Sequence, residues 1–195
     1  MNIEIKKLTP ELMEDYFDFF DNRAFTDDSP YRCYCQIYQM SKDEYQQHIS
    51  AAQADPGKVS RQVAEKQIAR GDLCGYLVYT NGVAIGWCNA NDRANFPTDS
   101  CGGEHFHITE AGREMAVVCF EIAPEFRGQG VATALLNKVI SDAKFNNYSA
   151  VVSFPVVRDE WYEWDCTGPI RLYEKFGFDL AEKHDNFVVM RKTLN

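Results

Sequence analysis

Hydrophobic and polar positions in the first third of the chain follow a strand pattern and then helical patterns. Residues 2–7 alternate as the residues of a strand do. Ser41 and Glu44 have the spacing of a capping box, which predicts a helix over about 42–53. The next helical pattern, "VSRQVAEKQIAR", is followed by Gly71, a residue typical of helix ends.

The middle of the chain begins with a hairpin pattern. The strand-like runs "CGYLVYT" and "VAIGWCNA" are joined by Asn81-Gly82, a strong signal for a tight hairpin turn. Residues 91–113 are polar and rich in glycine, which predicts a long loop. A strand over 115–122 and a helix over 128–145 follow.

The last third of the chain returns to short strands. "SAVVSF" predicts a strand, and Thr167 is expected to cap a short helix that ends at Gly177. Two further runs form a terminal hairpin around His184-Asp185. Hairpins adjoining strand–helix units predict an α+β fold, a mixed sheet covered by helices.

Composition and charge narrow the function classes. The chain has 195 residues, 45% of them hydrophobic, so we expect one domain, 1–195, with an ample core. A net charge of −9 argues against binding bulk nucleic acid, and no apolar run approaches the length that spans a membrane. The seven cysteines, including the pair Cys33 and Cys35, do not have the spacing of a disulfide framework or a zinc site. We therefore expect reduced thiols and no bound metal. Reduced thiols fit a cytoplasmic protein, which is the location we expect.

The stretch "CFEIAPEFRGQGVATALL" places an arginine and two glycines where a strand becomes a helix. A helix start carries unpaired N–H groups and the positive end of the helix dipole. Glycine allows an anion to approach those N–H groups, and Arg127 adds a positive charge, which favours a phosphate-binding turn. Neither the Walker A nor the dinucleotide pattern fits. An ordinary tight turn explains the same residues.

Three segments resemble the GNAT superfamily of N-acetyltransferases. "RGQGVA" matches its Arg/Gln-x-x-Gly-x-Gly/Ala signature with Arg127, Gly130 and Ala132. "RLYEKFGF" resembles its late helix and following strand, and "AIGW" its preceding hairpin strand. The chain looks most like a bacterial branch with an N-terminal Cys-x-Cys.

The resemblance implies a central mixed, mostly antiparallel sheet of six to seven strands, flanked by helices and splayed between the fourth and fifth strands. It implies N-acetyl transfer from acetyl-CoA to a primary amine of a small, unidentified acceptor, directly in a ternary complex. A strand N–H would stabilise the oxyanion. The residues expected to bind acetyl-CoA are Phe120, Ile122, Arg127, Gly128, Gln129, Gly130, Val131, Ala132 and Thr133.

Amine acetylation also needs proton transfers. An amine must lose a proton to attack, and Glu121 or Glu114 is expected to accept it, with Glu121 preferred. Each could instead be a solvent-facing strand charge. Tyr173 matches the position of the family's usual general acid, although core packing also explains it. Acetylation of Cys119 in a ping-pong route is a further alternative.

Other positions concern the acceptor. Trp161, Trp164 and Asp165 combine aromatic and acidic groups that suit an ammonium ligand, or else pack the loop. Many members of the family carry an asparagine seven residues before the tyrosine that corresponds to Tyr173, and this chain has Cys166 at that position.

The rival function is a non-catalytic acyl-CoA sensor of the same fold. The protein could also form a homodimer. His105 and His107 could be acceptor contacts or bases, or else plain loop residues, and "SPYRCYCQIY" could form the opposite wall of the acceptor site.

Overall fold

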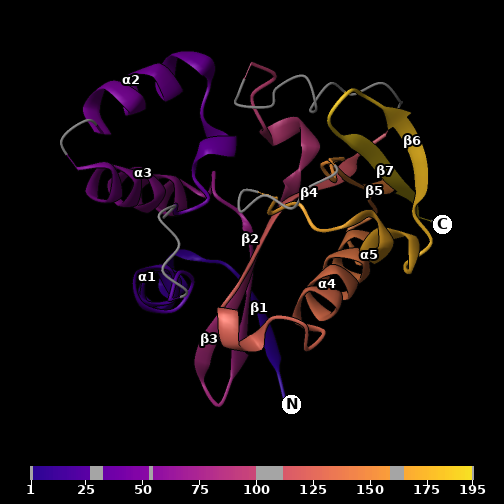
Figure 1. Ribbon diagram of the computed structural model, residues 1–195, viewed down its shortest axis with the longest axis horizontal. Helices are drawn as coiled ribbons and strands as arrows, with labels where there is room; N and C mark the ends of the chain where they lie inside the picture. The colour runs from indigo at the N-terminus through magenta and orange to yellow at the C-terminus, as the bar shows by residue number, and fades with distance from the viewer. Residues whose placement is uncertain (1, 27–32, 53–54, 100–111, 159–164, 195) are drawn as a thin grey trace.

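The chain forms a sheet with helices on both faces (Figure 1). The computed structural model describes residues 2–26, 33–52, 55–99, 112–158 and 165–194. The strands are β1 (Glu4–Lys7), β2 (Gly75–Thr80), β3 (Val83–Asp92), β4 (Glu114–Ile122), β5 (Ala150–Ser153), β6 (Asp179–Lys183) and β7 (Val188–Thr193). The α-helices are α1 (Met13–Asn22), α2 (Lys42–Ala52), α3 (Pro56–Arg70), α4 (Val131–Phe145) and α5 (Ile170–Glu174), and the short 3₁₀ turns include η2 (Ile37–Gln39) and η3 (Arg93–Asn95).

The seven strands lie in the order β1-β2-β3-β4-β5-β7-β6. Strands β4 and β5 run parallel, and the other neighbouring pairs are antiparallel. The mixed, mostly antiparallel sheet expected from the sequence is therefore confirmed. No helix in the described ranges is both long enough and apolar enough to cross a bilayer.

Several local predictions are confirmed by hydrogen bonds and backbone angles. The Ser41 N–H donates to Glu44 Oε2 at 2.8 Å, and the Glu44 N–H donates to Ser41 Oγ at 3.3 Å, which completes the capping box of α2. Asn81 and Gly82 have φ of 49° and 77°, as the tight turn between β2 and β3 requires. Gly71, with φ of 79°, ends α3.

One prediction of a helix start is wrong. Thr167 does not cap α5, because the helix begins at Ile170 and Pro169 is its N-cap. The Thr167 hydroxyl instead accepts a hydrogen bond from the Val156 N–H at 3.4 Å, which ties the loop to the chain after β5. Gly168 has a φ of 78° and Pro169 a ψ of 149°, so neither has helical backbone angles and the helix cannot begin before Ile170.

Helices cover the two faces of the sheet in separate groups (Figure 1). Helices α1 and α3 pack on one face, where the Tyr16 and Trp87 rings meet edge to face with centroids 4.9 Å apart. Helices α4 and α5 pack on the other face, where Leu135, Leu136 and Tyr173 are fully buried. The two buried clusters hold the sheet between them.

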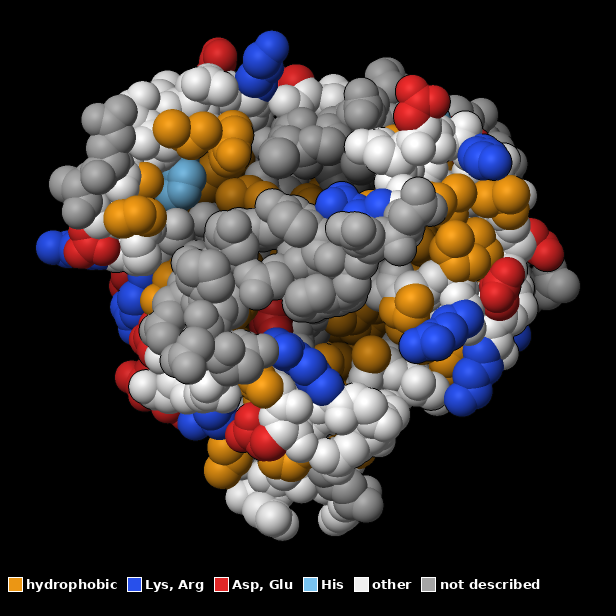
Figure 2. All heavy atoms as spheres, in the orientation of Figure 1, with side chains coloured by type: hydrophobic (Ala, Val, Ile, Leu, Met, Phe, Trp, Pro, Cys, Tyr) orange, Lys and Arg blue, Asp and Glu red, His pale blue; other side chains and the backbone are white. Residues whose placement is uncertain are grey.

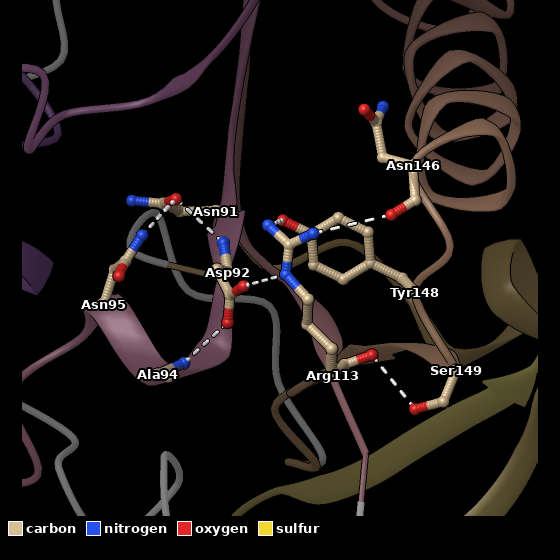
Figure 3. Close-up of polar contacts among 8 residues, drawn as sticks. All are labelled: Asn91, Asp92, Ala94, Asn95, Arg113, Asn146, Tyr148 and Ser149. Atoms are coloured by element: carbon tan, nitrogen blue, oxygen red, sulfur yellow. Dashed lines mark hydrogen bonds and ion pairs between the residues drawn. The ribbon is translucent and has the colours of Figure 1, made fainter.

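The start of β4 is fixed to its neighbours by Arg113 (Figure 3). Its guanidinium donates to Asp92 at the end of β3 at 2.6 Å and to the Tyr148 hydroxyl before β5 at 2.8 Å. The Ser149 N–H and hydroxyl both donate to the Arg113 carbonyl, at 2.7 and 3.0 Å. Strands β4 and β5 are therefore held side by side at the end where their pairing begins.

At the other end the two strands part. Pairing runs from Glu114 with Ala150 to Val117 with Ser153, while β4 continues to Ile122. The expected splay between the fourth and fifth strands thus begins after Val117.

A β-bulge lies at the same point. Asn89 of β3 pairs with Cys119 and Ala90 pairs with Val117, so Val118 is an extra residue in β4. Bulges bend a strand and increase its twist, and this one lies at the point where β4 and β5 part. It also places Val118 and Cys119 in the same buried cluster, beside α1 and α3, whereas Phe120 packs toward α4.

Candidate active site

A cavity of about 690 Å³ lies along the free end of β4. It joins the glycine turn before α4 to the segment that contains η2 and to the loop before α5. Figure 2 shows a hollow near the middle of the molecule, with apolar side chains inside it and Lys or Arg side chains at its edge. We call the part near the glycine turn the donor half, and the part near Cys33, Tyr38 and Cys166 the acceptor half.

The glycine turn forms one wall of the donor half. Gly128 and Gly130 have φ of 73° and 85°, a left-handed backbone that glycine adopts without strain. A Cβ at either position would meet no atom within 4 Å, so the backbone angle, not crowding, calls for glycine. Gly130 is the N-cap of α4 and supplies no side-chain cap, so the helix start faces the cavity with its positive dipole end. These features fit a phosphate group.

Three cationic side chains line the donor half. Arg127 donates to the Ile122 carbonyl at 2.9 Å and to Glu121 at 3.3 Å, which braces the end of β4. Arg171 and Lys175 are exposed and lie four residues apart in "RLYEK", so they project from the same side. We did not predict them as site residues, although this spacing next to the late-helix motif is a signal that could have identified them.

The expected donor-binding residues are largely brought together. All of them except Gln129 line the cavity, namely Phe120, Ile122, Arg127, Gly128, Gly130, Val131, Ala132 and Thr133. The Gln129 side chain donates to the Glu125 carbonyl at 2.7 Å and tightens the turn from outside. The sequence motif thus located most of one cavity wall.

The two candidate bases lie in different environments. Glu121 lines the cavity, its side chain is 14% exposed, and Arg127 holds it. Glu114 does not line the cavity, because it is 2% exposed between Arg93 at 2.7 Å and Arg191 at 2.9 Å. Its charge balances two arginines and ties β4 to β7 and η3.

Tyr173 lies behind the cavity wall. It is fully buried, and its hydroxyl donates to the Thr167 carbonyl. Gly168, the next residue, lines the cavity. Burial is the main cause that raises the pKa of Tyr173 well above its usual value, so the phenol stays protonated at neutral pH.

The acceptor half contains apolar, thiol and acidic groups. Phe25, Ile37 and Tyr38 line it together with Cys33, Cys35, Cys119 and Cys166. Asp165 also lines it and forms an ion pair with Arg158 at 3.3 Å. Trp161, Trp164, His105 and His107 lie outside the described residues. Within the described ranges no cluster of His, Cys, Asp and Glu has a metal-site arrangement.

A glycine-led helix start beside the free end of a strand suits a ligand that carries phosphate groups. The sequence model of the acetyltransferase (GNAT) family matches residues 34–178. The chain belongs to this family.

Solved structures agree with the assignment at the level of the fold. PaiA N-acetyltransferase from Thermoplasma acidophilum, in complex with coenzyme A, is 14% identical with a TM-score of 0.55, over 99% of both chains. A GNAT acetyltransferase from Listeria monocytogenes is 12% identical with a TM-score of 0.60, over 98% of this chain and 95% of its own. The ribosomal-protein-S18-alanine N-acetyltransferase from Escherichia coli is 12% identical with a TM-score of 0.51, over 100% of this chain and 95% of its own. No curated protein matches the sequence significantly.

Proposed function

We propose that this protein transfers an acetyl group from acetyl-CoA to the primary amine of a small acceptor, directly within a ternary complex. The observation that carries the proposal is that an uncapped helix start, three cations and a carboxylate, Glu121, line one cavity. Cations and helix N–H groups suit a polyanionic donor, and a carboxylate suits an amine that must be deprotonated.

Acetyl-CoA would lie with its phosphates at the donor half. The N–H groups of Gly130 to Thr133 and the side chains of Arg171 and Lys175 would hold its phosphates. The pantetheine arm would follow the free end of β4. There the Phe120 N–H already donates to the Cys166 carbonyl at 2.6 Å, so the loop before α5 takes the place of a fifth-strand partner. The pantetheine arm must therefore displace the hydrogen bond between Phe120 and Cys166, or hydrogen-bond to the β4 backbone after Phe120.

Two proton transfers complete the reaction. Glu121 accepts the proton of the attacking amine, because it is the candidate base that reaches the cavity. Tyr173 gives a proton to the departing CoA thiolate, whose acid has a pKa near that of cysteine, about 8.5. Its hydroxyl lies behind the cavity wall at Gly168, so this backbone must move before the proton can pass, and the same movement would relieve the burial that raises the pKa of Tyr173.

The acceptor half favours a compact amine with an apolar body. Aromatic and aliphatic side chains form much of its lining, and Glu121 and Asp165 are its acidic groups. An ammonium group is attracted by carboxylates and aromatic faces, so this lining suits a cationic amine. Trp161 and Trp164, next to Asp165 in sequence, stay predicted acceptor contacts.

The proposal is tested by product formation with a panel of primary amines. Each amine is incubated with acetyl-CoA and the protein, and N-acetylated product and CoA are quantified by mass spectrometry. We expect at least one amine to give product and CoA in equal amounts. Tight binding of acetyl-CoA without product from amines, amino acids, aminoglycosides and peptide N-termini would instead identify a non-catalytic acyl-CoA sensor.

Tyr173→Phe separates the acid role from packing. The variant keeps the ring and removes the hydroxyl, so the Thr167 carbonyl loses its partner and unfolding stability should fall by about 1–3 kcal/mol. If the hydroxyl is also the acid, kcat should fall by at least about tenfold, in keeping with general acid catalysis, at unchanged acetyl-CoA affinity. Thermal unfolding and steady-state kinetics measure the two effects. Lower stability with unchanged kcat, where chemistry limits the rate, would leave only the packing role.

A further inference from the structure

Thiols from three parts of the chain meet in the acceptor half. Cys35 precedes η2, Cys119 lies in β4 directly after the bulge, and Cys166 lies in the loop before α5. All three are free thiols that line the cavity, and Cys166 and Cys35 both raise the pKa of Cys119. The proposed acetyl transfer to an amine uses none of them.

Cys166 is the thiol that the surroundings activate. The Tyr38 hydroxyl lies 3.4 Å from its Sγ. Hydrogen bonding with Cys119 is the largest cause that lowers the pKa of Cys166, to about 7; Tyr38 lowers it further, and burial opposes both. Hydrogen bonding to Cys166 correspondingly raises the pKa of Cys119. A large share of Cys166 is therefore thiolate at neutral pH, while Cys119 stays protonated.

Other titratable groups near Cys166 do not cancel this activation. The charge of Asp165 raises the pKa of Cys166, but it is a minor cause, and Asp165 is ion-paired with Arg158. Cys33 and Tyr173 also interact with Cys166, and burial raises the pKa of each, so both remain neutral at neutral pH.

The backbone places this thiol beside the free part of β4. The Cys166 carbonyl accepts the Phe120 N–H at 2.6 Å, beyond the last β4–β5 pair at Val117. Under the proposed function, on which this step rests, the acetyl thioester lies along the same stretch of β4. A thiolate and a thioester in one cavity can exchange partners without any further reactant.

We propose that Cys166 is a self-acylation site that takes the acetyl group from bound acetyl-CoA when no amine is present. The Cys166 thiolate attacks the carbonyl carbon, a carbon–sulfur bond to Cys166 forms, and the carbon–sulfur bond to CoA breaks. CoA leaves as the thiolate and takes a proton from water. One thioester replaces another, so excess CoA reverses the reaction. The acetyl group on Cys166 occupies the acceptor half, and an amine bound there competes with the thiol.

The test uses the reduced full-length protein and isotopically labelled acetyl-CoA without amine. Intact mass and peptide mapping should show one acetyl group on Cys166, which is removed by excess CoA. Cys166→Ser should lower labelling at least about tenfold while acetyl-CoA still raises the thermal stability. Cys74→Ser, which removes a partly exposed thiol outside the cavity, should label as the wild type does.

The pH dependence gives a second readout. Alkylation of Cys166 by iodoacetamide should rise with pH around a midpoint near 7, about 1.5 units below an ordinary thiol, and Tyr38→Phe should move the midpoint upward. Acetyl-CoA binding without label on Cys166 would overturn self-acylation and leave the proposed function standing. No binding of acetyl-CoA would overturn both, and an alkylation midpoint near that of an ordinary thiol, about 8.5, would contradict the activated thiolate.

Discussion

Replacing Gly130 with aspartate is expected to abolish the stabilisation of the protein by acetyl-CoA. The variant puts a carboxylate at the N-cap of α4, where a pyrophosphate would meet the helix N–H groups. Acetyl-CoA at about 100 times its Kd should stabilise the wild type by about 2.7 kcal/mol, and Gly130→Asp by close to none. Thermal unfolding with and without ligand measures the difference.

Gly82→Asp is the matched control for this substitution. Gly82 has a similar φ, 77° against 85°, and a Cβ there would also meet nothing within 4 Å, but it lies in the β2–β3 turn. Both variants therefore carry a similar backbone cost, about 1 kcal/mol. If both keep the full ligand effect, the glycine turn does not bind the phosphates. If both lose it, the cause is general destabilisation.

Glu121→Gln is expected to lower kcat by about 10²–10⁴-fold, because the base that deprotonates the amine is removed. Glutamine keeps an acceptor oxygen for Arg127, so the brace at the end of β4 and the acetyl-CoA affinity should persist. Steady-state kinetics with an amine found in the panel, together with calorimetry, measure both quantities. In the wild type, kcat/KM should rise with pH as the catalytic base loses its proton, and this rise should be absent in Glu121→Gln.

Glu125→Gln controls for the loss of one negative charge near the turn. Glu125 is exposed, lies in the same segment between β4 and α4, and does not line the cavity. Its substitution should leave kcat within about twofold, since surface charges act weakly at a distance. An unchanged kcat in Glu121→Gln, with chemistry limiting, would show that water or another group accepts the proton.

Much of the fold could be predicted from interactions between residues that are close in sequence. The capping box at Ser41 and Glu44 and the Asn81-Gly82 turn each use interactions within a few residues, and each prediction is confirmed. The glycine turn at Gly128 and Gly130 was located for the same reason, since positive φ and a helix start are local properties. The wrong cap at Thr167 shows the limit, because Gly168 and Pro169 do not have helical backbone angles and the helix begins only at Ile170.

The acceptor half could not be predicted because it depends on tertiary structure. A strictly alternating β4 would put Cys119 on the α4 side with Val117, but the bulge at Val118 moves it to the side of Cys35. The burial of Glu114 between two arginines likewise depends on partners far along the chain. A single sequence gives no register, so neither result was available from it.

Calorimetric titration of the reduced wild-type protein with acetyl-CoA, NAD and ATP tests the central claim, an acyl-CoA site under the glycine turn, most directly. All three ligands carry a pyrophosphate, but only acetyl-CoA has an arm that can follow the free end of β4. We expect one acetyl-CoA bound per chain, with NAD and ATP at least about tenfold weaker, a difference of about 1.4 kcal/mol. Tighter binding of NAD or ATP, with no heat from acetyl-CoA, would contradict it.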